Sequence, residues 1–258
     1  MLSYQHGYHA GNRADVHKHA ALCILLARLV EKPKPLTYME THAGRGLYNL
    51  NGPEALKTGE AQEGIRRLRA SGGPPPGHPY RQVLESTEKA FGLGFYPGSP
   101  LIAKTLLRPE DQIHLMELHP QEHAALRRAV RGDNVHVHKR DGFEGVLALS
   151  PPTPRRGLVL IDPSYEVKTE YRATADFVQV LHRKWPEATI LVWYPVLEQA
   201  FGFELTAPLL KAGLPDLLHL EIAFPPLKDS HGMVGSGLIL INTPYGVEEA
   251  LHAVGKLI

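Results

Sequence analysis

One stretch of the sequence, residues 158–166, constrains the fold more than any other. Four consecutive apolar residues lead directly into Asp162 and Pro163. A short, continuous apolar run of this kind is typical of a strand that is buried on both faces, as in the middle of a parallel sheet. Proline has no backbone N–H to donate, so Pro163 ends the strand. We therefore expect Asp162 and Tyr165 at the carboxyl end of a central strand, where open α/β sheets bind their ligands.

The composition is that of an ordinary globular protein. Of the 258 residues, 43% are hydrophobic and 21% are charged, which argues against disorder and allows one large domain or one domain with an insertion. The formal net charge of +1 neither requires nor excludes a nucleic-acid partner. The start of the chain lacks the basic and apolar regions of a signal peptide, and no apolar run reaches transmembrane length. We therefore expect a cytoplasmic protein with no membrane partner.

Segments with the pattern of buried strands alternate with helical segments along most of the chain. Five of them are expected to pair in parallel through helical crossovers: residues 36–41, 112–118, 135–138, 158–161 and 189–193. Two later apolar stretches, residues 218–224 and 238–241, are too close together for a crossover helix and should form an antiparallel pair. The pattern predicts an α/β fold with a doubly wound, seven-stranded, mostly parallel sheet and one antiparallel strand.

Two helical regions have more specific signatures. Asp15 has the character of an N-cap for a helix over residues 16–31. Residues 59–92 contain two helical patterns on either side of a proline- and glycine-rich loop, which predicts a small inserted helical subdomain within a single domain of residues 1–258. Arginines in this insertion and elsewhere are individually best interpreted as solvated charges, although a set that shared one face would supply phosphate contacts.

Acidic residues follow four of the expected parallel strands. Glu40 ends the first of them, and Glu117, Asp141 and Asp162 follow the next three. A carboxylate after the second strand suits a ribose diol, because it accepts both hydroxyl hydrogens. Asp141 is followed by Gly142, an arrangement that suits an adenine amino group beside an open edge. This layout fits either a nicotinamide dinucleotide or S-adenosylmethionine.

Two observations favour S-adenosylmethionine. A dinucleotide site needs the G-x-G-x-x-G pattern at the start of the helix that holds the pyrophosphate, but after Gly44 and Gly46 the third glycine position is Asn49. The second observation is the sequence Asp-Pro-Ser-Tyr at residues 162–165, for which a dehydrogenase has no use. We therefore expect S-adenosylmethionine as the cofactor.

The Asp-Pro-Ser-Tyr sequence resembles the (D/N/S)-P-P-(Y/F/W) motif of amino-group methyltransferases. Four further blocks resemble the RlmJ-type 23S rRNA (adenine-N6)-methyltransferases: residues 4–19, 41–44, 96–100 and 232–237. The resemblance implies a Rossmann-like class I fold that depends on S-adenosylmethionine (SAM), with a helical subdomain inserted after the first sheet unit. It also implies N6-methylation of one specific adenine of 23S rRNA, on protein-free or partly assembled RNA.

The resemblance further implies roles for individual residues. The cofactor site would be lined by Lys18, His19, His42, Ser99, Glu117, Asp141, Gly142 and Asp162. The substrate adenosine would contact Tyr4, His6 and Tyr165, and catalysis would involve Asp162, Pro163 and Tyr165. In this hypothesis Asp162 and the Pro163 carbonyl accept the two N–H bonds of the amino group, and Tyr165 stacks on the ring. The family's second motif proline is Ser164 here, so we expect a looser loop with activity retained.

The sequence leaves several alternatives open. Tyr165 could be a core aromatic residue, and Asp162 could be a helix N-cap. The substrate could be an adenine in DNA, or the chain could be a non-catalytic RNA-binding protein of the same fold. Four histidines lie among residues 6–19, but their spacing matches no standard ligand pattern, so we expect no metal. The sequence contains no coiled coil, and we expect a monomer.

Overall fold

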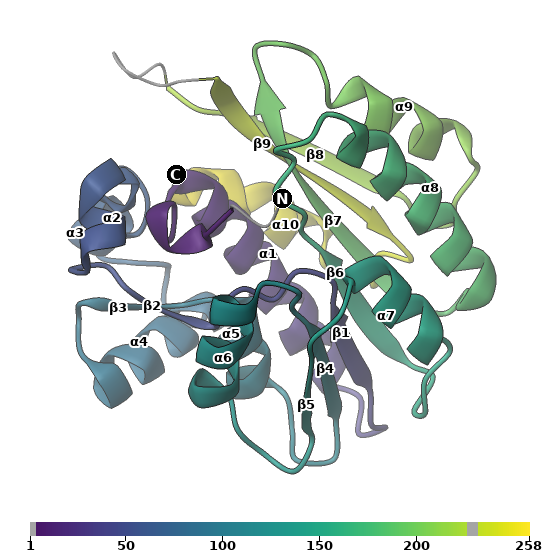
Figure 1. Ribbon diagram of the computed structural model, residues 1–258, viewed down its shortest axis with the longest axis horizontal. Helices are drawn as coiled ribbons and strands as arrows, with labels where there is room; N and C mark the ends of the chain where they lie inside the picture. Colours follow the sequence, from purple (N-terminus) through teal and green to yellow (C-terminus); the bar gives the residue numbers. More distant parts are fainter. Residues whose placement is uncertain (1–3, 226–231) are drawn as a thin grey trace.

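A seven-stranded sheet forms the centre of the molecule in the order β5-β4-β1-β6-β7-β9-β8 (Figure 1). The computed structural model describes residues 4–225 and 232–258. The strands are β1 (Thr37–Glu40), β4 (Gln112–Met116), β5 (Val135–His138), β6 (Gly157–Ile161), β7 (Thr189–Leu197), β8 (Leu218–Ala223) and β9 (Met233–Ile241). Only β9 runs antiparallel to its neighbours, β7 and β8. The predicted doubly wound sheet with one reversed strand is confirmed.

The predicted central strand lies in the middle of this sheet. All five residues of β6 are buried, and the strand pairs in parallel with β1 on one side and β7 on the other. In this register Glu40 pairs with Leu160, and Ile161 pairs with Val192. The carboxyl ends of β1, β6 and β7 therefore meet at one edge of the sheet, which places Asp162 between the first turn after β1 and the second half of β7.

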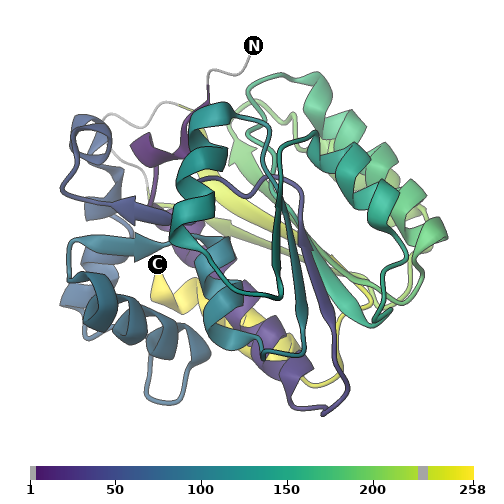
Figure 2. The ribbon, with the colours of Figure 1, turned by 60° about the horizontal axis from the view of Figure 1, so that its bottom comes forward.

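Helices cover both faces of the sheet (Figure 2). One layer packs on the larger apolar core and contains α1 (Arg13–Val30), α5 (Ser99–Leu106), α6 (Pro120–Ala129), α10 (Glu248–Ala253) and the short η3 (Val254–Leu257). The other contains α7 (Gly142–Leu149), α8 (Thr169–Lys184) and α9 (Phe203–Lys211). The sheet is therefore covered on both sides, as its apolar strands require. Helix α9 has no counterpart in the sequence-based prediction, and β9 begins at Met233, five residues earlier than expected.

The first long helix begins earlier than predicted. Asn12 is the N-cap of α1, because its side chain accepts a hydrogen bond of 2.8 Å from the backbone N–H of Asp15. The expectation that Asp15 caps the helix is therefore wrong. Gly11, at a φ of 78°, turns the chain so that its own N–H donates to the Asp15 carboxylate. This turn leaves Asp15 in the first helical turn, with its side chain free to face the site described below.

The insertion forms a group of short helices beside residues 4–12, which precede α1 and are called the N-terminal segment below (Figure 1). It contains α2 (Pro53–Thr58), η2 (Glu60–Gln62), α3 (Ile65–Ala70) and α4 (Pro79–Phe91), and a small antiparallel sheet of β2 (Leu47–Asn49) and β3 (Phe95–Pro97) lies at its base. The helical pattern predicted over residues 59–70 is interrupted at Gly64. A Cβ at Gly64 would lie 2.1 Å from the carbonyl oxygen of Gly11, so the break is where the insertion packs against the N-terminal segment.

Candidate active site

Asp162 lies directly after β6 and forms a close ion pair with Lys18 of α1. The Lys18 Nζ atom is 2.5 Å from Asp162 Oδ2 and 3.1 Å from Asp15 Oδ1. Lys18 is only 3% exposed, so burial alone would lower its pKa, but the charges of Asp162 and Asp15 outweigh burial and hold the pKa above its ordinary value. The ammonium group is therefore charged, and it fixes the orientation of the Asp162 carboxylate.

A continuous chain of polar contacts joins this ion pair to the N-terminal segment. The Tyr4 hydroxyl lies 2.8 Å from His6 Nδ1, and His6 Nε2 lies 2.8 Å from Asp15 Oδ2. His6 belongs to the short helix η1 (His6–Tyr8). Burial would raise the pKa of Asp15, but His6 and Lys18 outweigh it and hold the pKa well below its usual range. Two of the predicted substrate residues, Tyr4 and His6, are thus connected to Asp162 through Asp15 and Lys18.

Trp193 of β7 lies on another side of the ion pair. The Lys18 Nζ atom is 5.3 Å from the centroid of the indole ring, within the range of a cation–π contact. The indole N–H donates to Ser236 Oγ at 2.9 Å, and that hydroxyl also lies 2.9 Å from His17 Nδ1. The orientation of the ring is therefore set by β9 and α1 together. Trp193 is partly exposed, so it offers aromatic surface beside Lys18.

Tyr165 turns away from solvent in this structure. Its ring is 7% exposed and lies 4.5 Å from the ring of Tyr171, and its hydroxyl donates to the Trp193 carbonyl at 2.8 Å. The residue has a φ of 54°, in the left-handed region that non-glycine residues seldom adopt. The ring thus packs in the core under the loop, beside buried Pro163, and its stacking on a substrate base stays a prediction.

The loops after β1 and β4 are joined through Glu117. One carboxylate oxygen accepts the N–H of Gly44 at 2.8 Å, and the other accepts the N–H of His119 at 2.7 Å. Gly44 and Gly46 have φ angles of 62° and 76°, so this turn requires residues without a Cβ. A carboxylate has about four acceptor positions, so Glu117 keeps acceptor capacity for two further hydroxyl groups.

The start of α7 approaches β1 very closely. A Cβ at Gly142 would lie 1.9 Å from the carbonyl oxygen of Thr41, so only glycine fits at this position. Asp141 is the N-cap of α7 and accepts the N–H of Glu144 at 2.9 Å, which fixes the carboxylate at the edge of the sheet. His42 Nδ1 lies 2.8 Å from Thr41 Oγ1. Burial lowers the pKa of His42, and the charges of Asp162 and Asp141 oppose this.

Ser99 and His19 belong to two further groups of buried polar side chains. The Ser99 hydroxyl donates to the carboxyl group of Glu40, which also accepts the Tyr38 hydroxyl at 3.1 Å. Burial raises the pKa of Glu40 well above its usual range, and the nearby charge of Asp162 acts in the same direction. His19 Nδ1 lies 2.7 Å from the Tyr96 hydroxyl, and burial lowers the pKa of His19 to about 3. His19 is therefore neutral near pH 7.

Several residues of this arrangement have no clear signal in the sequence. The pattern around Asp15 indicates only a helix cap. Glu40 is recognisable in the sequence as an acidic residue at the end of a strand, but no function is predicted for it. Trp193 and Ser236 are not among the predicted site residues at all. An aromatic residue at the carboxyl end of a predicted parallel strand is a signal that could have found Trp193, whereas its contact with Ser236 depends on the pairing of β7 with β9.

The residues present fit S-adenosylmethionine. Glu117 offers a fixed carboxylate acceptor beside a glycine turn, as a ribose diol requires. Gly142 follows Asp141 and has no room for a side chain, so the Asp141 carboxylate is the polar group that this strand end offers to a cofactor amino group. Ser99, His19 and Lys18 add polar groups at the other end of the arrangement. The chemistry of this donor set, rather than one contact, supports the fit.

A model of one protein family, described as "Ribosomal RNA large subunit methyltransferase D, RlmJ", matches residues 33–258. The chain belongs to the RlmJ family. It is 40% identical over 256 residues to Ribosomal RNA large subunit methyltransferase J of Escherichia coli K12, covering 98% of this chain and 91% of that protein. The protein of the same name from Haemophilus influenzae is 40% identical over 258 residues, covering 98% and 92%.

A crystal structure of a Legionella pneumophila protein has the same fold. It superimposes with a TM-score of 0.87 at 36% identity, and the match covers 96% of this chain and 92% of that one. Family membership and the observed sheet together confirm the predicted Rossmann-like class I methyltransferase fold. The sequence-based recognition of the RlmJ family is also confirmed.

Two further properties of the RlmJ-family chain follow from the structure. Within residues 4–225 and 232–258, no helix is long and apolar enough to cross a membrane. In the same part of the chain, no group of three or more histidine, cysteine, aspartate and glutamate side chains is arranged to hold a metal ion.

Proposed function

We propose that this RlmJ-family protein transfers a methyl group from S-adenosylmethionine to the N6 atom of one specific adenine in 23S rRNA. Family membership supports the class of reaction and substrate. The observation that carries the chemistry is the Asp162–Lys18 pair at the carboxyl end of the central strand. Lys18 holds one oxygen of Asp162, and the other has no hydrogen-bond partner among the described residues. The free oxygen is available to accept an N–H bond from the substrate.

The amino group of adenine is a poor nucleophile because its lone pair is delocalised into the ring. Asp162 and the carbonyl of Pro163 accept its two N–H bonds and thereby favour a more tetrahedral nitrogen with a localised lone pair. When bound, S-adenosylmethionine supplies an electrophilic methyl group on a sulfonium. Lys18 holds the Asp162 carboxylate in position before transfer, and Asp162 or solvent takes the proton afterwards.

The remaining predicted site residues have consistent places in this proposal. Glu117 binds the ribose hydroxyls, and Asp141 with Gly142 borders the adenine of the cofactor, near His42. Ser99, His19 and Lys18 lie toward its methionine end. On the substrate side, the network from Tyr4 through His6 ends at Lys18, so a nucleotide that contacts Tyr4 is placed beside Asp162. Tyr165 acts there either by stacking or by fixing Trp193.

A base inside a helix must be unstacked before it can enter this site, at a cost of a few kcal/mol that is smaller in a loop. We therefore propose protein-free or partly assembled 23S rRNA as the substrate, modified in the cytoplasm by a monomer. The alternatives are an adenine in DNA as the substrate, and a non-catalytic protein that binds RNA and S-adenosylmethionine.

The decisive experiment is methyl transfer from radiolabelled S-adenosylmethionine to protein-free 23S rRNA, followed by identification of the product nucleoside. We expect label in N6-methyladenosine for the wild type and none for Asp162→Ala. Asp176→Asn is a matched control, because that aspartate is exposed on α8 and paired with Arg172. Transfer to a DNA strand of the same sequence, but not to RNA, would establish the DNA alternative. Binding of S-adenosylmethionine without methyl transfer to RNA or to DNA would leave only the non-catalytic alternative.

A further inference from the structure

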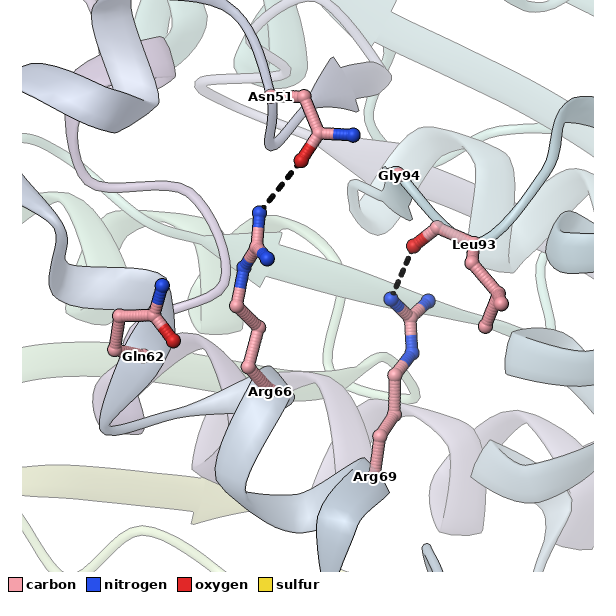
Figure 3. A pocket seen from close by; sticks show the side chains of 6 residues that line it. All are labelled: Asn51, Gln62, Arg66, Arg69, Leu93 and Gly94. Atoms are coloured by element: carbon pink, nitrogen blue, oxygen red, sulfur yellow. Dashed lines mark hydrogen bonds between the residues drawn. The ribbon is translucent and has the colours of Figure 1, made fainter.

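A hollow of about 350 Å³ lies on the insertion, and Asp162 is not among the residues that line it (Figure 3). Helix α3 contributes two arginines to it, Arg66 and Arg69, one helical turn apart. Both side chains point from α3 toward the loops before α2 and before β3 (Figure 3). The complete lining is Asn51, Gln62, Arg66, Arg69, Leu93 and Gly94.

Backbone carbonyls hold both guanidinium groups in place. Arg66 donates from Nη2 to the Leu50 carbonyl at 3.0 Å and to Asn51 Oδ1 at 2.7 Å. Arg69 donates from Nη1 to the Leu93 carbonyl at 2.7 Å and from Nη2 to the Phe95 carbonyl at 3.0 Å. Each guanidinium has five N–H donors, so both keep donors that these contacts do not use. The side chains are therefore oriented in advance, with binding capacity left.

Neither charge in the hollow is neutralised by a carboxylate. Among the described residues, no acidic side chain lies within ion-pair distance of Arg66 or Arg69. Their neighbour Arg67 differs, because it lies 3.7 Å from Glu63 and its side chain is 56% exposed. Two adjacent, partly buried positive charges without counter-charges attract an anion, and arginine's planar fork suits phosphate oxygens in particular.

The rest of the lining suits a nucleotide rather than a bare anion. The amide side chains of Asn51 and Gln62 stand at the rim, and each can donate and accept hydrogen bonds. Leu93 is 64% exposed and provides an apolar surface on which the face of a base can pack. Positive charges for the phosphate backbone, a surface for the face of a base and hydrogen-bonding groups for its edge are the elements with which proteins hold single-stranded nucleic acid.

The hollow is also fixed relative to the N-terminal segment. The N–H of Ile65, the first residue of α3, donates to the Gly11 carbonyl at 2.8 Å, and Glu60 accepts a hydrogen bond of 3.0 Å from the Asn12 side chain. Gly11 in turn donates to Asp15, which belongs to the network that reaches Tyr4 and Asp162. The insertion lies beside the N-terminal segment (Figure 1), so the hollow has a fixed position relative to a strand of RNA that contacts this segment.

We propose that Arg66 and Arg69 bind a phosphodiester of the RNA substrate, at a nucleotide outside the active site, with the neighbouring base against Leu93. The proposal rests on the proposed function, since it names a second contact with the same RNA. Its role is affinity for the strand: the contact is made equally before and during methyl transfer, so it lowers the KM for RNA and leaves kcat unchanged.

The test is the double variant Arg66→Gln/Arg69→Gln, assayed for methyl transfer over a range of RNA concentrations at saturating S-adenosylmethionine. Glutamine keeps a donor for the carbonyls and removes the charge. We expect the KM for RNA to rise about tenfold or more, because both arginines lose their charge-assisted hydrogen bonds to the phosphate. We expect kcat to change less than twofold. The salt dependence of RNA binding should also lose about 0.7 units of slope per phosphate contact.

Arg67→Gln is the matched control, since it removes the same charge from the same helix at a residue that faces Glu63. An unchanged KM and salt slope in a double variant that unfolds at the wild-type temperature would overturn the proposal. So would an equal rise in KM for the control.

If the double variant does not fold, photo-crosslinking of wild-type protein to RNA that contains 4-thiouridine tests the same point. A crosslink in the peptide that contains Leu93 supports the proposal, and crosslinks confined to other surfaces overturn it. A wild type that methylates no RNA would instead be a failure of the proposed function, which these assays report separately.

Discussion

Lys18 and Asp162, 144 residues apart in the sequence, meet at 2.5 Å where α1 passes the carboxyl end of β6. The contact closes a line of polar groups, because Asp15 lies on the other side of Lys18 and the His6 ring lies beyond Asp15. An ammonium group this deeply buried is stable only with carboxylates around it. The N-terminal segment is thus attached to the loop after β6 by electrostatics as well as by packing.

The first prediction concerns Lys18→Met. The substitution leaves the buried carboxylates of Asp15 and Asp162 without the cation between them, so we expect unfolding free energy to fall by about 3 kcal/mol. Activity should fall about 100-fold or more, because Asp162 is no longer held in position. Thermal unfolding and single-turnover methyl transfer measure the two effects. Lys139→Met, at an exposed position, is the control, and an active, fully stable Lys18→Met protein would contradict the assignment.

The second prediction concerns Glu117→Gln. Burial raises the pKa of Glu117, while the N–H groups of Gly44 and His119 favour its charged form. The amide has one acceptor oxygen in place of two, so it cannot accept both backbone N–H groups and also bind a ribose diol. We expect the Kd for S-adenosylmethionine to rise about tenfold to a hundredfold, as measured by calorimetry. The KM for RNA should stay unchanged, and Glu110→Gln on the surface should alter neither constant.

The third prediction concerns Gly142→Ala. The new Cβ would lie 1.9 Å from the Thr41 carbonyl oxygen, so α7 must move away from β1. Such overpacking costs about 1–3 kcal/mol, and for a chain of this size each kcal/mol lowers the Tm by about 2–4 °C. Gly255→Ala is the control, because its Cβ would approach a side-chain methyl group, Cγ2 of Ile222 at 3.1 Å, and no backbone atom within 4 Å. An unchanged Tm for Gly142→Ala would show that the start of α7 can shift freely.

The fold is predictable where the periodic pattern of apolar residues is strong, and it is not predictable where that pattern is weak. The alternation of five strand patterns with helical segments predicts the parallel part of the sheet, and the short spacing of the last two strands predicts the reversed strand. The strands β2 and β3 have three residues each, too few to show a period of two. The predicted N-cap of α1, Asp15, is wrong because Asn12 suits an N-cap equally well. The choice between the two residues depends on the turn at Gly11.

The site was predictable only as separate residues. Motif resemblance named Lys18 and Asp162, but no spacing in the sequence shows that the two side chains touch. The orientation of Trp193 depends on a hydrogen bond to Ser236, which exists because β7 and β9 are neighbours in the sheet. Tyr165 shows the same dependence, since the left-handed backbone after Pro163 decides whether its ring faces the core or the substrate.

The last prediction concerns pH and the pair His9–Glu60, which joins the N-terminal segment to the insertion. His9 Nδ1 lies 2.7 Å from Glu60 Oε1, and the rings of His9 and Tyr4 are stacked with centroids 5.7 Å apart. The hydrogen bond to Glu60 raises the pKa of His9 above its ordinary value of 6.5. Burial would raise the pKa of Glu60, but its bonds to His9 and Asn12 outweigh this and lower it from 4.5.

The sign of the effect follows from these directions. The His9 contribution to stability is fully present below pH 6.5 and is lost as the pH rises through the raised folded pKa. The Glu60 contribution is present above pH 4.5 and is lost as the pH falls through the lowered folded pKa. The pair therefore stabilises most between about pH 4.5 and 6.5, and Glu60→Gln should destabilise the protein more at pH 6 than at pH 8.5.

An NMR titration of the His9 ring measures the coupling directly. In Glu60→Gln the pKa of His9 should fall toward its ordinary value, because the substitution removes the charge and leaves only a neutral hydrogen-bond partner. Glu63→Gln is the control, since Glu63 pairs with Arg13 and Arg67 and does not contact His9. If the two variants gave the same His9 titration, Glu60 would not be the cause of the raised His9 pKa, and this prediction would be wrong.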